Sequence, residues 1–221
     1  MEWSNVPIDL YCERLGPGWW AEPLNAVSNL GFIVAGIALS RQSARRGEPA
    51  SVQALGWLIV LVGCGSAAFH TAATRWAEVL DVAFIALFIS WFVACYARHR
   101  WGAPWWLALL CVGFFHAAGT LMDKSFEPGA FNGSVAYFPA LAGLILFGLL
   151  SGLKDRWHRA IWFFAAAGIF AASLSLRTLD QSLCDLWPQG THWAWHLLNA
   201  LTLTTATLGI SHSPGLRRTR F

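Results

Sequence analysis

The chain has 221 residues, of which 56% are hydrophobic and 12% charged, and its mean hydropathy is +0.48. A soluble domain carries roughly a quarter charged residues, so this composition excludes an ordinary soluble protein and indicates a polytopic membrane protein. The net charge is +3. Because the basic residues fall in short segments between apolar stretches, they are typical of an orientation signal and give no reason to expect a nucleic-acid partner.

Residues 1–24 are polar and acidic. They lack the apolar core of a secretory signal, so we expect no cleavable signal peptide. We expect this segment to lie on the non-cytoplasmic side, followed by a helix bundle over residues 25–211 and a basic cytoplasmic tail over residues 212–221.

Seven apolar stretches follow the N-terminal segment, each close to the roughly 20 residues that a helix needs to cross a bilayer. They cover residues 25–41, 52–71, 78–97, 104–121, 134–152, 160–178 and 191–210. Short polar segments separate them, and no internal repeat is visible. We therefore predict an all-α fold, a seven-transmembrane-helix bundle that forms a single domain over residues 1–221.

The basic residues alternate between the connecting segments. Most follow the first, third, fifth and seventh stretches: Arg41, Arg45, Arg46, Arg98, Arg100, Lys154, Arg156, Arg159, Arg217, Arg218 and Arg220. Short cytoplasmic segments of membrane proteins are enriched in Lys and Arg. We therefore expect a multi-pass protein with a non-cytoplasmic N-terminus and a cytoplasmic C-terminus.

Three histidines lie near the ends of two apolar stretches. His70 ends the run Gly-Ser-Ala-Ala-Phe-His, and His192 and His196 begin the run Thr-His-Trp-Ala-Trp-His. On helices that cross in opposite directions, all three imidazoles lie at about the same depth, and positions i and i+4 share one helix face. Three imidazoles with an open fourth position are the ligands of a hydrolytic zinc site. We therefore predict that these three histidines bind zinc.

Two further residues are expected beside this site. Ser66 lies four residues before His70 on the same helix face, and Asp81 follows across a short loop. A carboxylate in a mostly apolar pocket can accept and return the proton of a metal-activated water, while a hydroxyl can orient that water or donate to an oxyanion. The alternative is that the histidines only link membrane helices by hydrogen bonds, which their agreement in depth disfavours.

Further motifs accompany these residues along nearly the whole chain. In order, they are Tyr11-Cys12-Glu13, Ala21-Glu22-Pro23-Leu24-Asn25-Ala26-Val27-Ser28-Asn29, Gly65-Ser66-Ala67-Ala68-Phe69-His70, Asp81, Asp180 with Cys184, and His192-Trp193-Ala194-Trp195-His196. This combination resembles the alkaline ceramidase family, within a superfamily of seven-helix membrane hydrolases that includes adiponectin-receptor-like proteins. The resemblance implies zinc ligands at the three histidines, catalytic roles for Ser66 and Asp81, and a disulfide between Cys12 and Cys184. An oxidising compartment permits that bond.

The resemblance also implies a calcium site in the N-terminal segment. Glu13 and Glu22 match calcium ligands of the family, whereas Leu10 stands at the position of a family aspartate, with Asp9 the neighbouring carboxylate. Leu15 occupies another polar position and can offer only its carbonyl. Calcium binds carboxylate and carbonyl oxygens alike, so we expect an altered site at Asp9, Glu13 and Glu22. The alternative is a solvated acidic segment.

By the resemblance, the expected activity is that of a zinc-dependent hydrolase acting on linear amides. Its substrate is a membrane lipid with an N-acyl amide bond, ceramide first, which would give sphingosine and free fatty acid. One alternative is a zinc-containing seven-helix receptor or sensor without strong hydrolase activity, although the chain has no large soluble domain. Another is a proton or metal transporter, which would need polar residues through the full membrane depth. Acyl-chain specificity and oligomeric state stay open.

Overall fold

The computed structural model describes residues 3–155 and 157–211, so Arg156 and the predicted basic tail with Arg217, Arg218 and Arg220 lie outside the described residues. Its elements in chain order are η1 Trp3–Asn5, α1 Pro23–Ser28, α2 Leu30–Arg45, α3 Ala50–Ala72, α4 Arg75–Cys95, η2 Tyr96–Arg100, α5 Trp105–Asp123, η3 Ala130–Tyr137, α6 Phe138–Asp155, α7 Ala160–Leu179, η4 Gln181–Leu183 and α8 His192–Ile210.

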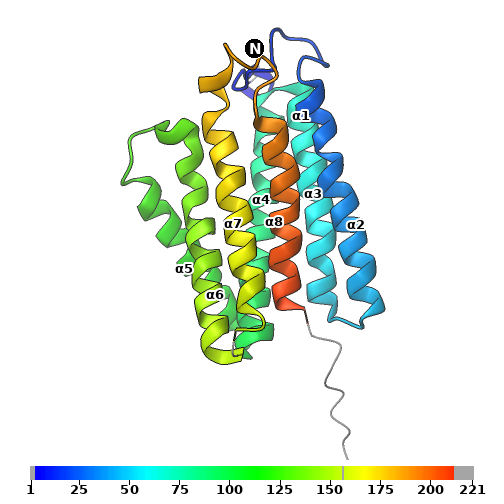
Figure 1. Cartoon of the computed structure of the whole chain (residues 1–221), viewed down its shortest axis with the longest axis vertical. Coiled ribbons are helices and arrows are strands. Elements are labelled where there is room, and N and C mark those ends of the chain that lie inside the picture. Colours follow the sequence, from blue (N-terminus) through cyan, green and yellow to red (C-terminus); the bar gives the residue numbers. More distant parts are fainter. Residues whose placement is uncertain (1–2, 156, 212–221) are drawn as a thin grey trace, which may run out of the picture.

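The long helices run alongside one another as a bundle (Figure 1). Within the described residues, six helical segments are long and apolar enough to cross a membrane: Pro23–Arg45, Ala50–Ala72, Arg75–Arg100, Trp105–Asp123, Ala130–Lys154 and Ala160–Leu179. The seventh, α8, has 19 residues but carries two histidines, one asparagine and four threonines, which lower its hydropathy. It packs against α7, α2 and α3 inside the bundle. The all-α, multi-pass helical bundle is therefore confirmed.

Several helices, such as α2 at its end and α4 at its start, extend a few residues past the predicted apolar stretches. The first stretch is divided between α1 and α2 at Asn29, and the fifth begins as η3 before α6. Hydropathy marks only the apolar part of a helix, whereas backbone hydrogen bonding continues through polar residues at the membrane surface. Arg45 and Arg75, for example, lie inside α2 and α4.

Close packing of α2 against α3 depends on two glycines. A Cβ atom added to Gly36 would lie 2.5 Å from the Gly56 carbonyl oxygen, and one added to Gly56 would lie 2.7 Å from the Ser40 nitrogen. Small residues let membrane helices approach until their backbones touch. This approach fixes the position of α3, which carries Ser66 and His70.

The helix α5 lies at the outer edge of the bundle (Figure 1) and contributes one buried side chain, Ala108. The other helices surround a core of large apolar side chains such as Phe32, Ile59 and Phe163. Most of the α5 surface is therefore available to lipid.

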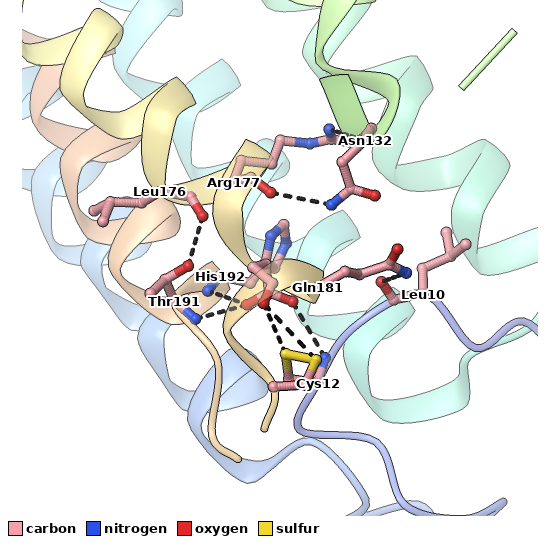
Figure 2. Close-up of a disulfide and its surroundings, with 10 residues drawn as sticks. Leu10, Cys12, Asn132, Leu176, Arg177, Gln181, Thr191 and His192 are labelled. Atoms are coloured by element: carbon pink, nitrogen blue, oxygen red, sulfur yellow. Dashed lines mark hydrogen bonds between the residues drawn. A yellow bond between two sulfur atoms is a disulfide. The ribbon is translucent and has the colours of Figure 1, made fainter. Parts of the chain in front are cut away.

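The N-terminal segment crosses the end of the bundle where α3 ends and α4 and α8 begin. The Ile8 nitrogen donates to the Ala73 carbonyl at 2.8 Å, and the Arg75 nitrogen donates to the Val6 carbonyl at 3.1 Å. The predicted disulfide between Cys12 and Cys184 is confirmed, with 5.2 Å between the Cα atoms (Figure 2). It ties this segment to the connection between α7 and α8.

Candidate metal centre and active site

Three buried histidines converge at the end of the bundle covered by the N-terminal segment. His70 comes from the last turn of α3, and His192 and His196 come from the first turns of α8. Their ligand nitrogens all lie within 4.8 Å of one another. Over the described ranges, this is the one group of three or more His, Cys, Asp or Glu side chains close enough to hold a metal ion. The structure thus brings the predicted ligands together.

The start of α8 is fixed by Asp180, whose side chain is fully buried. Its Oδ1 atom accepts hydrogen bonds from the backbone nitrogens of Thr191 at 2.6 Å and His192 at 2.9 Å, and its Oδ2 atom accepts from that of Cys12 at 3.2 Å. Figure 2 shows Cys12, Thr191 and His192 gathered at the disulfide. A carboxylate on unpaired N–H groups stabilises a helix N-terminus, so Asp180 positions the turn that carries His192.

Hydrogen bonds orient two of the three imidazole rings. His70 Nδ1 lies 2.6 Å from Glu22 Oε2, and His196 Nδ1 lies 2.7 Å from Ser28 Oγ. Ser28 Oγ donates to the Asn25 carbonyl at 2.9 Å, so it accepts from His196. With Nδ1 of both rings protonated, each Nε2 presents a lone pair, as a metal ligand requires.

The ring of His192 is held by stacking. Tyr11 lies against it with 3.7 Å between the ring centroids. The Nδ1 atom of His192 is buried and has no hydrogen-bond partner among the described residues. An unpaired buried nitrogen beside two oriented imidazoles fits a metal ligand. Three imidazoles are nitrogen donors of the kind that zinc binds, so this set fits a zinc ion.

The candidate catalytic residues border the histidines. Ser66 Oγ lies 3.5 Å from His196 Nε2. The α4 backbone approaches α3 closely here, because a Cβ atom added to Gly65 would lie 3.3 Å from the Asp81 Cα. Ser66, Asp81, His192 and His196 line one cavity of about 20 Å³, which is enough for roughly one water molecule. Asp81 Oδ1 is buried without a partner in the described part of the chain and can bind that water.

Two polar residues of this cavity, Arg177 of α7 and Asn199 of α8, were missed by the sequence analysis. Arg177 Nη1 donates to the Asn132 carbonyl at 2.6 Å, and its guanidinium stacks on Tyr137. Asn199 is 6% exposed, and its Oδ1 atom lacks a partner among the described residues. Arginine inside a predicted apolar stretch is itself a functional signal, and Asn199 follows His196 by three residues on the same helix face.

The predicted calcium ligands do not form one cluster. Asp9 is exposed. The Glu13 side chain reaches the start of α1, where its carboxylate accepts hydrogen bonds from the Leu24 and Asn25 nitrogens at 2.6 and 2.8 Å. Glu22 is 2% exposed and contacts His70 instead.

Glu22 is held in its charged form. Burial by itself would raise the pKa of Glu22, but the contact with His70 and the hydrogen bonds from Asn25 and Arg14 outweigh burial and lower that pKa. Burial is the largest influence on the neighbouring Tyr11 and raises the pKa of its phenol well above the ordinary value, although the positive charge of Arg177 opposes it. Tyr11 is therefore neutral beside His192.

Two further cavities with mainly apolar walls adjoin the small polar one in turn. A cavity of about 60 Å³ between α4, α6, α7 and α8 shares Tyr137 and Asn199 with it. A larger cavity of about 690 Å³ lies beside α5 and α6 and shares Phe115 and Phe147 with the 60 Å³ cavity. The polar centre is thus the end of a series of adjoining spaces with apolar walls.

The apolar helices make this chain an integral membrane protein. The buried histidines at the ends of two of these helices form its candidate metal centre. A family model described as Ceramidase matches residues 17–214. The chain therefore belongs to the ceramidase family, which makes it a ceramidase-type hydrolase. A search of curated proteins found no match.

Proposed function

We propose that this protein is a zinc-dependent intramembrane amidase that hydrolyses the N-acyl amide bond of a membrane lipid, with ceramide as the first substrate to test. The observation that carries the proposal is the convergence of His70, His192 and His196 next to Ser66 and Asp81. Glu22 and Ser28 support the same set by orienting two of the rings.

A zinc ion held by the three histidines would polarise the amide carbonyl and activate a water molecule. Asp81 is the proton carrier in this proposal: it accepts the proton of the water and delivers it to the leaving amine. Ser66 donates a hydrogen bond to the carbonyl oxygen as negative charge develops on it.

The adjoining apolar cavities suit the hydrocarbon chains of the lipid. The inner cavity is walled by side chains such as Phe88, Phe92 and Leu144. The outer cavity is bordered by α5, a helix that is largely exposed to lipid. The chain-binding path therefore runs inside the membrane, while the amide lies at the polar end. Asn199 faces both spaces and is positioned for a polar group next to the amide.

The non-cytoplasmic placement of this centre is part of the proposal. The disulfide lies at the same end of the bundle as the histidines, and disulfides persist in oxidising compartments. Arg45, Arg98 and Lys154 lie in the last turns of helical segments at the opposite end of the bundle, as the rule of positive cytoplasmic segments requires.

The experiment is a panel of lipid amides and matched esters incubated with purified protein of known metal content. Release of fatty acid and free amine is measured by mass spectrometry. Hydrolysis of ceramide in proportion to zinc supports the proposal. Ligand-induced stabilisation without product release would favour the receptor alternative.

A further inference from the structure

The buried side chain of Arg14 joins the N-terminal segment to the metal centre. Its exposure is 4%. The Nε atom donates to Glu22 Oε1, Nη1 donates to the Gly16 carbonyl at 3.1 Å, and Nη2 donates to the His70 carbonyl at 3.3 Å. One guanidinium therefore binds the turn before α1, the residue preceding α1 and the last turn of α3.

The two carboxylates that match calcium ligands of the family, Glu13 and Glu22, already accept hydrogen bonds from the protein. Glu22 uses one carboxylate oxygen for Arg14 and the other for His70 and Asn25. Glu13 uses both of its oxygens for backbone N–H groups. The Leu10 carbonyl accepts from Gln181 Nε2 at 2.9 Å.

These contacts do not fit a calcium ion, which takes six to eight oxygen ligands. Asn25 Oδ1 and Asn29 Oδ1 are buried without a partner among the described residues, but two amide oxygens cannot supply such a set. The Arg14 guanidinium also places a fixed positive charge next to the Glu22 carboxylate. A divalent ion placed beside it would be repelled, and strongly so in a buried setting.

We infer that Arg14 takes the role of a bound cation, so that the N-terminal segment of this protein assembles without calcium. Because Arg14 holds Glu22, which in turn contacts His70 Nδ1, Arg14 is also a positioning residue for a ligand of the metal centre. This second part rests on the proposed zinc site. The first part does not.

Calcium binding by the purified wild-type protein tests the first part directly. The protein is dialysed to equilibrium against radioactive calcium, and its thermal midpoint is compared in buffer freed of divalent ions and in buffer with added calcium. We expect no stoichiometric calcium and an unchanged midpoint. About one calcium ion per chain, or a midpoint that rises with calcium, would overturn the inference.

Zinc affinity tests the positioning role. Arg14→Gln removes the charge, Arg14→Lys keeps it, and Arg75→Gln is the matched control, since Arg75 pairs with Glu78 at the same end of the bundle but is 41% exposed. Loss of a contact behind a metal ligand weakens metal binding about 10- to 100-fold. We expect that loss for Arg14→Gln, a smaller one for Arg14→Lys and none for Arg75→Gln.

Equal zinc affinity of wild type and Arg14→Gln would overturn the positioning role. If Arg14→Gln does not fold, the comparison of Arg14→Lys with Arg75→Gln decides it, because Lys cannot reproduce the three-sided contact. If the wild type binds no zinc, the proposed metal centre is wrong and the positioning role falls with it. The calcium measurement still decides whether Arg14 serves as the cation.

Discussion

Glu22 Oε2 lies 2.6 Å from His70 Nδ1, and both side chains are buried. The two residues are 48 positions apart, one just before α1 and the other in the last turn of α3. A carboxylate on the second ring nitrogen of a metal-binding histidine fixes its tautomer and ring orientation. Glu22 is therefore part of the candidate metal centre.

Substitution of Glu22 by Gln should weaken zinc binding, because the amide retains the shape of the side chain but loses the charge that orients His70. We expect an affinity about 10- to 100-fold lower, measured by competition with a chromophoric chelator. Glu78→Gln is the control, since Glu78 is a partly exposed residue paired with Arg75. An unchanged affinity in Glu22→Gln would show that the contact does not serve the metal.

Ser66 should assist catalysis without being the attacking group. A histidine that binds zinc cannot also act as the free general base of a serine, and the imidazole that contacts Ser66 Oγ is that of His196, a proposed zinc ligand. Ser66→Ala should therefore lower kcat by about 10²- to 10³-fold, the usual cost of one transition-state hydrogen bond, and leave measurable activity. Asp81→Asn should lose more, because it removes the proposed proton carrier.

Hydroxylamine trapping distinguishes attack by a metal-activated water from attack by the Ser66 hydroxyl. With water as the nucleophile, no acyl group becomes attached to the protein, and mass spectrometry of wild type quenched during turnover should find Ser66 unmodified. Detection of an acylated Ser66, released by hydroxylamine, would contradict the metal-activated water even if the zinc site is correct.

Gly190→Ala should destabilise the protein. Gly190 has φ of +61°, and an added Cβ atom would collide with the Asp180 carboxylate that holds the start of α8. Strain of this kind costs about 1–3 kcal/mol, to be measured as a fall in thermal midpoint. Gly168→Ala is the control, because a Cβ atom there has open space in the described structure. Equal midpoints for the two variants would argue against this account of the α8 start.

Ala140→Phe should change chain-length preference. Ala140 of α6 lines the apolar cavity next to the polar centre, so a larger side chain shortens the path available to a hydrocarbon chain. Hydrolysis of long-chain amides should fall more than that of short-chain amides, as measured by kcat/KM across an acyl series. Ala165→Phe on the exposed side of α7 is the control. A uniform loss across the series would disagree with the proposed chain path.

Hydropathy and helical spacing sufficed to predict the bundle and the convergence of the three histidines, because both depend on local periodicity and depth. The role of Glu22 could not be predicted that way. Its contact with His70 depends on how the N-terminal segment folds over the bundle, and the charge on Arg14, its partner, gave no sequence signal. Asp180 was recognised within a motif, but its function at the start of α8 required the backbone path through Gly190.

The most direct test compares wild type with His196→Ala, each purified, supplied with zinc and given ceramide of defined acyl length. Zinc per chain and released fatty acid are measured on the same samples, with helicity checked by circular dichroism. The proposed function predicts about one zinc and fatty-acid release for wild type, and loss of both in a variant that stays helical. Fatty-acid release by His196→Ala at the wild-type rate would contradict it.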